Sequence, residues 1–370
     1  MRVAPDGADE AAAALRDAGR AVRIVGGATK LRWGRPVHAR VELSTAAMAG
    51  VVEHHVGDLT AVVRAGTTLQ EAQSVFRAAG QMLALDPPEA DAATLGGVVA
   101  AGDTGPLRHR YGAGRDLVVG IQVVLGDGTV ARAGGRVIKN VAGYDLPKLF
   151  AGSFGSLGLL TEFVVRLHPV PGARATAVGR TGDPAVLQRA AVAVGSAPFE
   201  LESFDVRADA DGCSLLARVA GMAVADRAER VAEAMRAADL DAEVESGDDE
   251  PLWDHQRNGQ RGELVVRVSA VRGELERVVR AAVGAGGELV GRASLGVSWV
   301  RLPAADGVDA VARLRRELAT RPCVVLDAPD AVREAVDPWG PIEGEALMRR
   351  VKARFDPSGV CNPGLFGEGW

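Results

Sequence analysis

The segment from residue 173 to residue 330 repeats one order of expected elements, and this repetition constrains the fold more than any other feature. The order is strand, helix, strand, strand, helix, strand. Apolar strand patterns and amphipathic helix patterns place the first copy at 175–178, 184–194, 201–206, 214–219, 223–237 and 242–246. The second copy follows at 264–268, 274–283, 288–291, 296–302, 307–318 and 323–326. No residue motif repeats, so the duplication rests on element order alone.

Each copy has the split βαβ order that is typical of a ferredoxin-like unit. We therefore predict two such units side by side at 173–330, preceded by a first domain at 1–172 and followed by a C-terminal segment at 331–370. Residues 247–262 are expected to form the linker between the two copies. The acidic run Asp248, Asp249 and Glu250 in this linker is expected to be solvated.

In the first 172 residues and in the tail, glycines and prolines mark where the expected helices and strands end. A helix pattern at 8–18 stops at Gly19, and a short apolar strand at 22–25 runs directly into Gly26 and Gly27. Asp127 and Gly128 lie between two strand patterns, which predicts a hairpin. In the tail, a helix pattern at 344–355 precedes a loop at 356–364 that contains two prolines and two glycines.

Charge, cysteine spacing and hydropathy exclude several classes of protein. The formal net charge is −5, which argues against nucleic acid as the main partner. Three widely spaced cysteines suggest neither a disulfide framework nor a zinc or iron–sulfur site. The N-terminus does not read as a signal peptide, and no run of about 18 apolar residues predicts a transmembrane segment. We therefore expect a protein of a reducing compartment.

Four glycine-rich segments are candidates for close contact between the backbone and a ligand. In the first, the strand at 22–25 ends in two glycines whose N–H groups can form a nest for phosphate oxygens. It matches neither the Walker loop nor the G-x-G-x-x-G fingerprint, and an ordinary tight turn is the alternative. The second segment, 92–102, has small residues after Thr94 that leave room for a flat ligand. Close helix packing is the alternative there.

The other two segments contain chemically active side chains. The loop at 105–112 has Arg108, His109 and Arg110 between glycines, and a solvated, inert loop is the alternative. The fourth segment comprises residues 139–146 and the three glycines at 152, 155 and 158. A spacing of three lets a backbone ribbon approach a cofactor closely, and regular core packing rarely needs it.

In this order, the four segments resemble the flavoproteins of the vanillyl-alcohol oxidase and p-cresol methylhydroxylase (PCMH) type. The shared motifs read A-T-L-G-G at 93–97 and G-S-F-G-S-L-G-L-L-T-E at 152–162. Two strings, I-K-N-V-A-G-Y-D-L at 138–146 and F-D-P-S-G-V-C-N-P-G at 355–364, are most similar to the FAD-binding E subunits of bacterial glycolate oxidases. The resemblance implies an α+β fold, with a two-part PCMH-type FAD-binding domain and a cap of two ferredoxin-like βαββαβ units.

The resemblance also implies which residues contact the FAD. Its pyrophosphate is expected against Ile24, Val25, Gly26, Gly27, Ala28, Thr29 and Lys30. Its isoalloxazine and ribityl region is expected against Pro87, Thr94, Gly96, Gly97, Gly102, Thr104 and Gly105. The ADP end is expected against Gly152, Ser153, Gly155, Ser156, Gly158 and Leu160, with Asn362 where the tail returns. Flavinylated relatives have a histidine in the first loop, which this chain lacks, so the FAD is expected to be non-covalent.

Two functions remain open on these grounds. The first is an FAD-dependent oxidoreductase that acts on the CH–OH group of a small 2-hydroxy acid such as glycolate or lactate, alone or within a complex. The second is an accessory flavoprotein subunit that relays electrons or stabilises the complex without oxidising substrate. The resemblance implies a larger flavoprotein subunit and an iron–sulfur subunit as partners. The expected location is the cytoplasm, either free or at the inner membrane through those partners.

The catalytic residues and the absence of a metal are further expectations of the resemblance. Tyr144 and Lys139 belong to a segment that the family places near the flavin ring, although a structural role at the domain hinge is the alternative. His109 and Arg110 are the other two candidates. Catalytic relatives have cap histidines that bind a metal, whereas His255 is the only histidine after His168 in this chain. We therefore expect no metal site.

Overall fold

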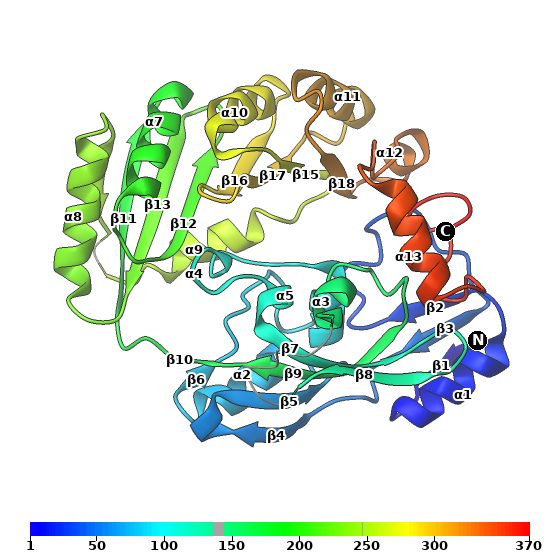
Figure 1. The fold of residues 1–370 in the computed structure, drawn as a ribbon. Helices are drawn as coiled ribbons and strands as arrows, with labels where there is room; N and C mark the ends of the chain where they lie inside the picture. The colour runs from blue at the N-terminus through cyan, green and yellow to red at the C-terminus, as the bar shows by residue number, and fades with distance from the viewer. Residues whose placement is uncertain (136–143, 246) are drawn as a thin grey trace.

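The computed structural model describes residues 1–135, 144–245 and 247–370, and these residues form two main bodies (Figure 1). The upper body in Figure 1 is built on an eight-stranded sheet and the lower one on a five-stranded sheet. The C-terminal end of the chain returns from the upper body to the lower one.

All eight strands of the large sheet come from residues 174–327, in two consecutive units. The first unit comprises β11 (Arg174–Thr181), α7 (Pro184–Ser196), β12 (Leu201–Ala208), β13 (Cys213–Ala220), α8 (Val224–Arg236) and β14 (Asp241–Val244). The second comprises β15 (Val265–Ser269), η2 (Arg272–Glu274), α10 (Leu275–Gly284), β16 (Glu288–Arg292), β17 (Val297–Arg301), α11 (Gly307–Glu317) and β18 (Cys323–Asp327).

The strand order β14-β11-β13-β12-β16-β17-β15-β18 confirms the predicted pair of ferredoxin-like units. Within each unit the strands follow the order fourth, first, third, second, and every pairing is antiparallel. The second strands, β12 and β16, pair with each other over Asp205–Ala208. The two units therefore share one continuous sheet.

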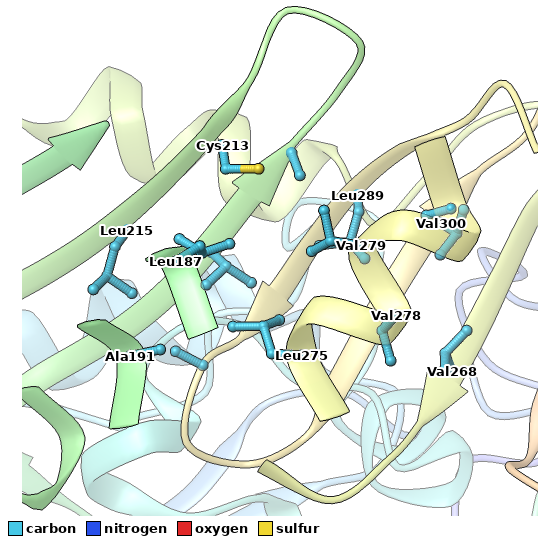
Figure 2. Packing of buried hydrophobic residues seen from close by; sticks show 14 of the residues in the cluster. Leu187, Ala191, Cys213, Leu215, Val268, Leu275, Val278, Val279, Leu289 and Val300 are labelled. Carbon is cyan, nitrogen blue, oxygen red and sulfur yellow. The ribbon is translucent and has the colours of Figure 1, made fainter. Parts of the chain in front are cut away.

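Helices cover one face of this sheet, and the other face is turned toward the first domain (Figure 1). Figure 2 shows the hydrophobic core between the helices and the strands, with Leu187 of α7 near Leu215 and Val279 of α10 near Leu289. Because side chains alternate along a strand, Val266 and Val268 of β15 join this core, while Val265 and Arg267 project to the opposite face.

The described residues of the first domain form three sheets. The five-stranded sheet has the order β4 (Val51–His55), β5 (Thr60–Arg64), β9 (Leu159–Arg166), β7 (Val118–Val124), β8 (Val130–Gly134). A parallel three-stranded sheet has the order β1 (Arg2–Val3), β3 (Val41–Ser44), β2 (Val22–Val25) and packs against α1 (Ala8–Ala18). Strands β6 (Gln81–Met82) and β10 (His168–Pro169) form a small pair. The short helices are η1 (Val56–Asp58), α2 (Leu69–Arg77), α3 (Leu95–Ala101), α4 (Arg108–Tyr111), α5 (Gly114–Leu117) and α6 (Leu146–Phe150).

The C-terminal segment contains α12 (Asp330–Ala335) and α13 (Glu345–Phe355). Its last part is bound to the first domain by hydrogen bonds. The ammonium group of Lys352 is buried and donates to the carbonyl oxygens of Ser156 at 2.7 Å and Cys361 at 2.9 Å. It also pairs with Asp356 at 2.5 Å. The backbone N–H of Val22, at the start of β2, donates to the carbonyl of Val360 at 2.8 Å. The tail is thus part of the first domain.

The expectation of a solvated linker at 247–262 is wrong. Residues Glu250–Asn258 form a helix, α9, whose Trp253 is fully buried. Asp249 is buried as well, and Arg218 of β13 binds the carboxylates of Asp249 and Glu250. The acidic run looked solvated because its cationic partner lies about thirty residues earlier on another strand, where no local pattern reveals it.

Candidate functional site

The loop after β2 contacts the segment before α3 so closely that side chains are excluded. A Cβ atom on Gly26 would lie 2.4 Å from Oγ1 of Thr94, and one on Gly27 would lie 1.9 Å from the carbonyl oxygen of Ala92. The hydroxyl of Thr94 accepts hydrogen bonds from the N–H groups of Gly27 and Gly97, both at 3.3 Å. Two of the predicted glycine-rich segments therefore hold each other in place.

A cavity lies between the end of β2, helix α3, the glycine loop at 152–158 and the tail. The predicted residues that line it are Ile24, Gly26, Lys30, Gly96, Gly97, Gly155, Gly158, Leu160 and Asn362. They come from three of the four glycine-rich segments and from the tail, as the resemblance implies. The sequence reasoning missed the remaining lining residues, which are Arg23, Leu31, Trp33, Val37, Thr45, Ala100, Ala101, Phe154, Leu159 and Leu365. Ala100, Ala101, Phe154 and Leu159 lie inside the glycine-rich segments but were not singled out there. Leu31, Trp33, Val37 and Leu365 are apolar and belong to no motif.

Other predicted cofactor residues do not line this cavity. They are Val25, Gly27, Ala28, Thr29, Pro87, Thr94, Gly102, Thr104, Gly105, Gly152, Ser153 and Ser156. Pro87 lines a separate groove on the side of α9. Thr104 and Ser153 are buried, and among the described residues neither hydroxyl has a hydrogen-bond partner. Their assignment to FAD stays a prediction.

Asp103 connects Lys30 of the first loop with Arg261 of the cap. The ammonium group of Lys30 lies 3.2 Å from the Asp103 carboxylate, which also accepts a hydrogen bond at 2.6 Å from Arg261 of the cap. Burial lowers the pKa of Lys30, and the charge of Asp103 opposes that change. The guanidinium of Arg261 lies over the ring of Trp33, 4.9 Å from its centroid.

A second buried cluster joins the domains near Gly105. The side chains of Arg292 and Asp205 are fully buried and pair at 2.6 Å, and Nε of Arg292 donates to the carbonyl of Gly105 at 3.1 Å. Asp86 accepts a hydrogen bond from the N–H of Leu107 at 3.1 Å. Burial raises the pKa of Asp86 to about 7 and that of Asp205 to about 6.

The structure describes three of the four predicted catalytic residues, and these three differ in burial. His109 is partly buried with its ring edge on Phe204 of the cap, and Nδ1 has no partner among the described residues. Burial lowers the pKa of His109, which keeps it neutral at pH 7. Arg110 is exposed, 4.0 Å from Glu200, and the Tyr144 residue is 94% exposed. Lys139 lies outside the described residues.

Two negative findings concern the described part of the chain. No group of three or more histidine, cysteine, aspartate or glutamate side chains there is placed to hold a metal ion. Likewise, none of the helices in residues 1–135, 144–245 and 247–370 combines the length and the apolar character needed to cross a membrane.

Sequence comparison identifies the N-terminal part of the chain. Residues 1–134 match the family model described as an FAD binding domain. The glycolate oxidase subunit GlcE of Escherichia coli is 42% identical over 149 residues, which are 40% of this chain and 42% of that protein. The glycolate oxidase subunit GlcD of Bacillus subtilis is 37% identical over 35% of this chain and 27% of its own length. The mitochondrial D-lactate dehydrogenase [cytochrome] of Arabidopsis thaliana is 38% identical over 32% and 20%. The match therefore spans less than half of each relative.

Structural comparison covers almost the whole chain. Alkyldihydroxyacetonephosphate synthase aligns with a TM-score of 0.71 at 16% identity, over 98% of this chain and 75% of its own. p-Cresol methylhydroxylase with substrate bound aligns with a TM-score of 0.75 at 15% identity, over 99% and 88%. The expected α+β fold of the PCMH type is thereby confirmed.

The cavity fits a flavin dinucleotide on three observations. Gly26, Gly97 and Gly155 expose backbone to it, and a Cβ on Gly26 has no room. Lys30 supplies a cation on the wall where phosphate oxygens are expected. The orphaned hydroxyl of Ser153 lies next to lining residue Phe154 and has hydrogen-bonding capacity to spare. Non-covalent binding of the FAD stays a prediction, based on Gly27, Ala28 and Thr29 at the place where flavinylated relatives have a histidine.

Proposed function

Because residues 1–134 are an FAD-binding domain and the whole chain has the fold of the PCMH-type oxidases, we propose that it is an FAD-dependent oxidoreductase of small 2-hydroxy acids and one subunit of a complex. The main observation behind the proposal is the cavity between the first loop, α3, the loop at 152–158 and the tail. The glycolate oxidase and D-lactate dehydrogenase names among its relatives support the substrate class.

The lining residues have distinct roles in this proposal. Gly26 and Lys30 would contact the pyrophosphate, and Gly155 with Gly158 the ADP end. The apolar side chains of Trp33 and Phe154 would exclude water from the cavity. When bound, FAD supplies the acceptor for the hydride that leaves C2 of the substrate.

The hydroxyl proton of the substrate needs an acceptor on the protein. His109 suits this role best among the three predicted residues that the structure describes, because burial lowers the pKa of its imidazole and Nδ1 has no partner among the described residues. It lies at the junction of the domains, on α4 and against Phe204 of β12. Arg110 and Tyr144 face solvent, and we keep them as candidates for contact with a partner or substrate.

A second function remains in view, that of an accessory flavoprotein subunit. His255, the only histidine after His168, lines a groove with Arg207, Glu288 and Arg301 and does not line the cofactor cavity. The cap therefore brings no histidine to that cavity. In this case the larger flavoprotein subunit would oxidise the substrate, and an iron–sulfur subunit would accept the electrons. We propose the same two partners for both functions.

The experiment that tests the proposal starts with the absorption spectrum of the purified full chain before and after acid precipitation. Flavin that moves into the supernatant supports non-covalent FAD, and flavin that stays in the pellet contradicts it. The flavin-bearing chain is then mixed without oxygen with glycolate, D-lactate or L-lactate. Bleaching of the flavin by one of these acids supports the oxidoreductase. A fully loaded chain that no 2-hydroxy acid reduces supports the accessory subunit.

A further inference from the structure

Arginine side chains lie on the face of the cap sheet that is turned toward the first domain. Val265 and Trp299 on this face form one apolar cluster with Ala101 of α3. Ala101 also lines the cofactor cavity, so this part of the cap is its direct neighbour. Arg267 lies two residues after Val265 on the same side of β15. Arg292 belongs to this face as well, with its guanidinium 4.8 Å from the ring centroid of Trp299.

The arginines of this junction differ in whether their charge is neutralised. Arg292 pairs with Asp205 at 2.6 Å. By contrast, the guanidinium groups of Arg267 in the cap and Arg108 of α4 make no hydrogen bond and no ion pair within the described part of the chain, although both residues are partly buried. Asp116 acts on Arg108 through its charge without pairing with it. Burial lowers the pKa of both, and the charge of Arg108 lowers that of Arg267 further.

The nearest acidic group does not remove this imbalance. Asp103 is the one carboxylate that influences Arg267 electrostatically in the described structure. It already binds Lys30 at 3.2 Å and Arg261 at 2.6 Å. Asp103 therefore forms no ion pair with Arg267, whereas Arg261 has a second carboxylate partner in Glu89 at 2.9 Å. A partly buried guanidinium without a counter-ion, such as that of Arg267, is unfavourable. An anion from outside the chain would supply the counter-ion that Arg267 lacks.

A third donor lies next to Arg267. Trp299 is its register partner on the neighbouring strand β17, on the same face of the sheet. The indole Nε1 of Trp299 is buried and has no acceptor among the described residues. Buried indole N–H groups usually find a partner, so this one also points to a missing acceptor.

We propose that Arg108 and Arg267, assisted by Nε1 of Trp299, bind the carboxylate of the small acid at the junction of the two domains. This inference rests on the proposed function, because it assigns the anion to the substrate. The planar guanidinium fork matches the two oxygens of a carboxylate. In a 2-hydroxy acid the carboxylate is attached directly to C2, so its site must adjoin the flavin, and Ala101 connects this cluster to the cofactor cavity.

The test uses the purified full chain with its FAD and oxalate as the probe, since oxalate carries carboxylates and has no hydrogen on carbon to lose. Binding is measured by calorimetry and by the change in flavin absorbance. Arg267→Gln and Arg108→Gln are each expected to weaken oxalate binding about tenfold or more at unchanged FAD content. Trp299→Phe keeps the ring and removes the donor, with an expected weakening of about threefold to tenfold. Arg230→Gln, which changes an exposed arginine on α8 of the cap, is the matched control and is expected to bind as wild type does.

Two additional readouts keep the test independent of activity. Removing an uncompensated charge is expected to raise the melting temperature of Arg267→Gln, and oxalate is expected to stabilise the wild type more than this variant. Inorganic phosphate serves as the second anion, and it is expected to bind more weakly than oxalate. Phosphate that binds as tightly as oxalate would overturn the assignment to a carboxylate.

The outcomes for this site and for the proposed function are distinguishable. Oxalate binding that is equal in wild type, Arg108→Gln and Arg267→Gln overturns the site, even if glycolate still reduces the flavin. Oxalate binding that is lost in both variants supports the site, even if no 2-hydroxy acid reduces the wild-type flavin. In that second case only the proposed oxidation fails.

Discussion

The side chain of Asn362 accepts a hydrogen bond at 2.8 Å from the backbone N–H of Ile24, a residue 338 positions away. Its amide Nδ2 donates at 2.7 Å to the carbonyl of Phe154. One residue of the tail thereby connects the end of β2 with the glycine loop at 152–158. Ile24, Phe154 and Asn362 all line the cofactor cavity, so the tail fixes the distance between two of its walls.

Asn362→Ala is expected to loosen the cavity. Two hydrogen bonds are lost, which corresponds to about 2 kcal/mol of unfolding free energy. The FAD affinity is expected to fall by about tenfold or more, as measured by fluorescence titration of the stripped protein. Asn258→Ala, at an exposed position of α9, is the control. Equal FAD affinity in Asn362→Ala and wild type would show that the tail does not shape the cavity.

Gly27→Ala tests the contact between the first loop and the segment before α3. The new Cβ would meet the Ala92 carbonyl oxygen at 1.9 Å, so the backbone must move. We expect a loss of about 2–4 kcal/mol in unfolding free energy and a clear drop in retained FAD. Gly57→Ala is the matched control, because nothing lies within 4 Å of its Cβ. A Gly27→Ala protein that unfolds in urea like wild type would contradict this packing.

Asp86 makes the folded protein less stable as the pH rises. Its pKa is about 7 in the folded chain against 3.8 for an unperturbed aspartate, so the folded state holds the proton more tightly. The stabilisation is complete below pH 3.8 and is lost progressively as the pH rises to about 7. Between pH 5 and pH 8, wild type is expected to lose on the order of 2 kcal/mol relative to Asp86→Asn.

Urea unfolding at several pH values checks this difference. Asp91→Asn, an exposed aspartate in the same segment, is expected to follow the wild-type curve. The comparison between proteins also cancels the opposite contribution of the histidines with lowered pKa, which are His109, His168 and His255. Parallel curves for wild type and Asp86→Asn would mean that the Asp86 carboxyl is not buried as the structure places it.

His109→Gln tests the proton acceptor. If Nδ1 accepts the hydroxyl proton of the substrate, flavin reduction by glycolate or lactate is expected to slow by about 10²–10⁴-fold, with retained FAD unchanged. Because burial lowers the pKa of His109, the wild-type rate is expected to stay level at neutral pH and to fall only at a pH below the usual range for a histidine. Anaerobic stopped-flow measurements give both the rate and the pH profile. A variant that keeps the wild-type rate and profile would exclude His109.

Much of the secondary structure and the duplication could be predicted from the sequence. The helix pattern at 8–18 agrees with α1 at both ends, because Gly19 adopts the left-handed conformation that its position requires. The hairpin at Asp127 and Gly128 joins β7 to β8, with φ of +82° at Gly128. Both signals are local, since a few neighbouring residues decide the backbone angles. The order of elements at 173–330 is likewise a sum of local periodicities.

The candidate site could be predicted only in part. The glycine segments and Asn362 are recognisable motifs, and nine of their residues line one cavity. Trp33 and Leu365, which line it as well, carry no motif and come to the cavity only through packing against the cap. Tyr144 was a reasonable candidate on its motif, but the structure exposes it to solvent.

Local sequence patterns predicted most of the elements outside α9, their duplication, and the glycine-rich segments whose backbone comes into close contact. The tertiary fold decided which charges meet. Arg218 pairs with Asp249 across 31 residues of sequence, Arg292 pairs with Asp205 across 87 residues, and Arg261 pairs with Asp103 across 158 residues. It also decided that Arg267 is left without a carboxylate of its own. The reason is physical, because turns and periodicity depend on neighbours along the chain, whereas the energy of a buried charge depends on groups that strand order and domain packing bring beside it.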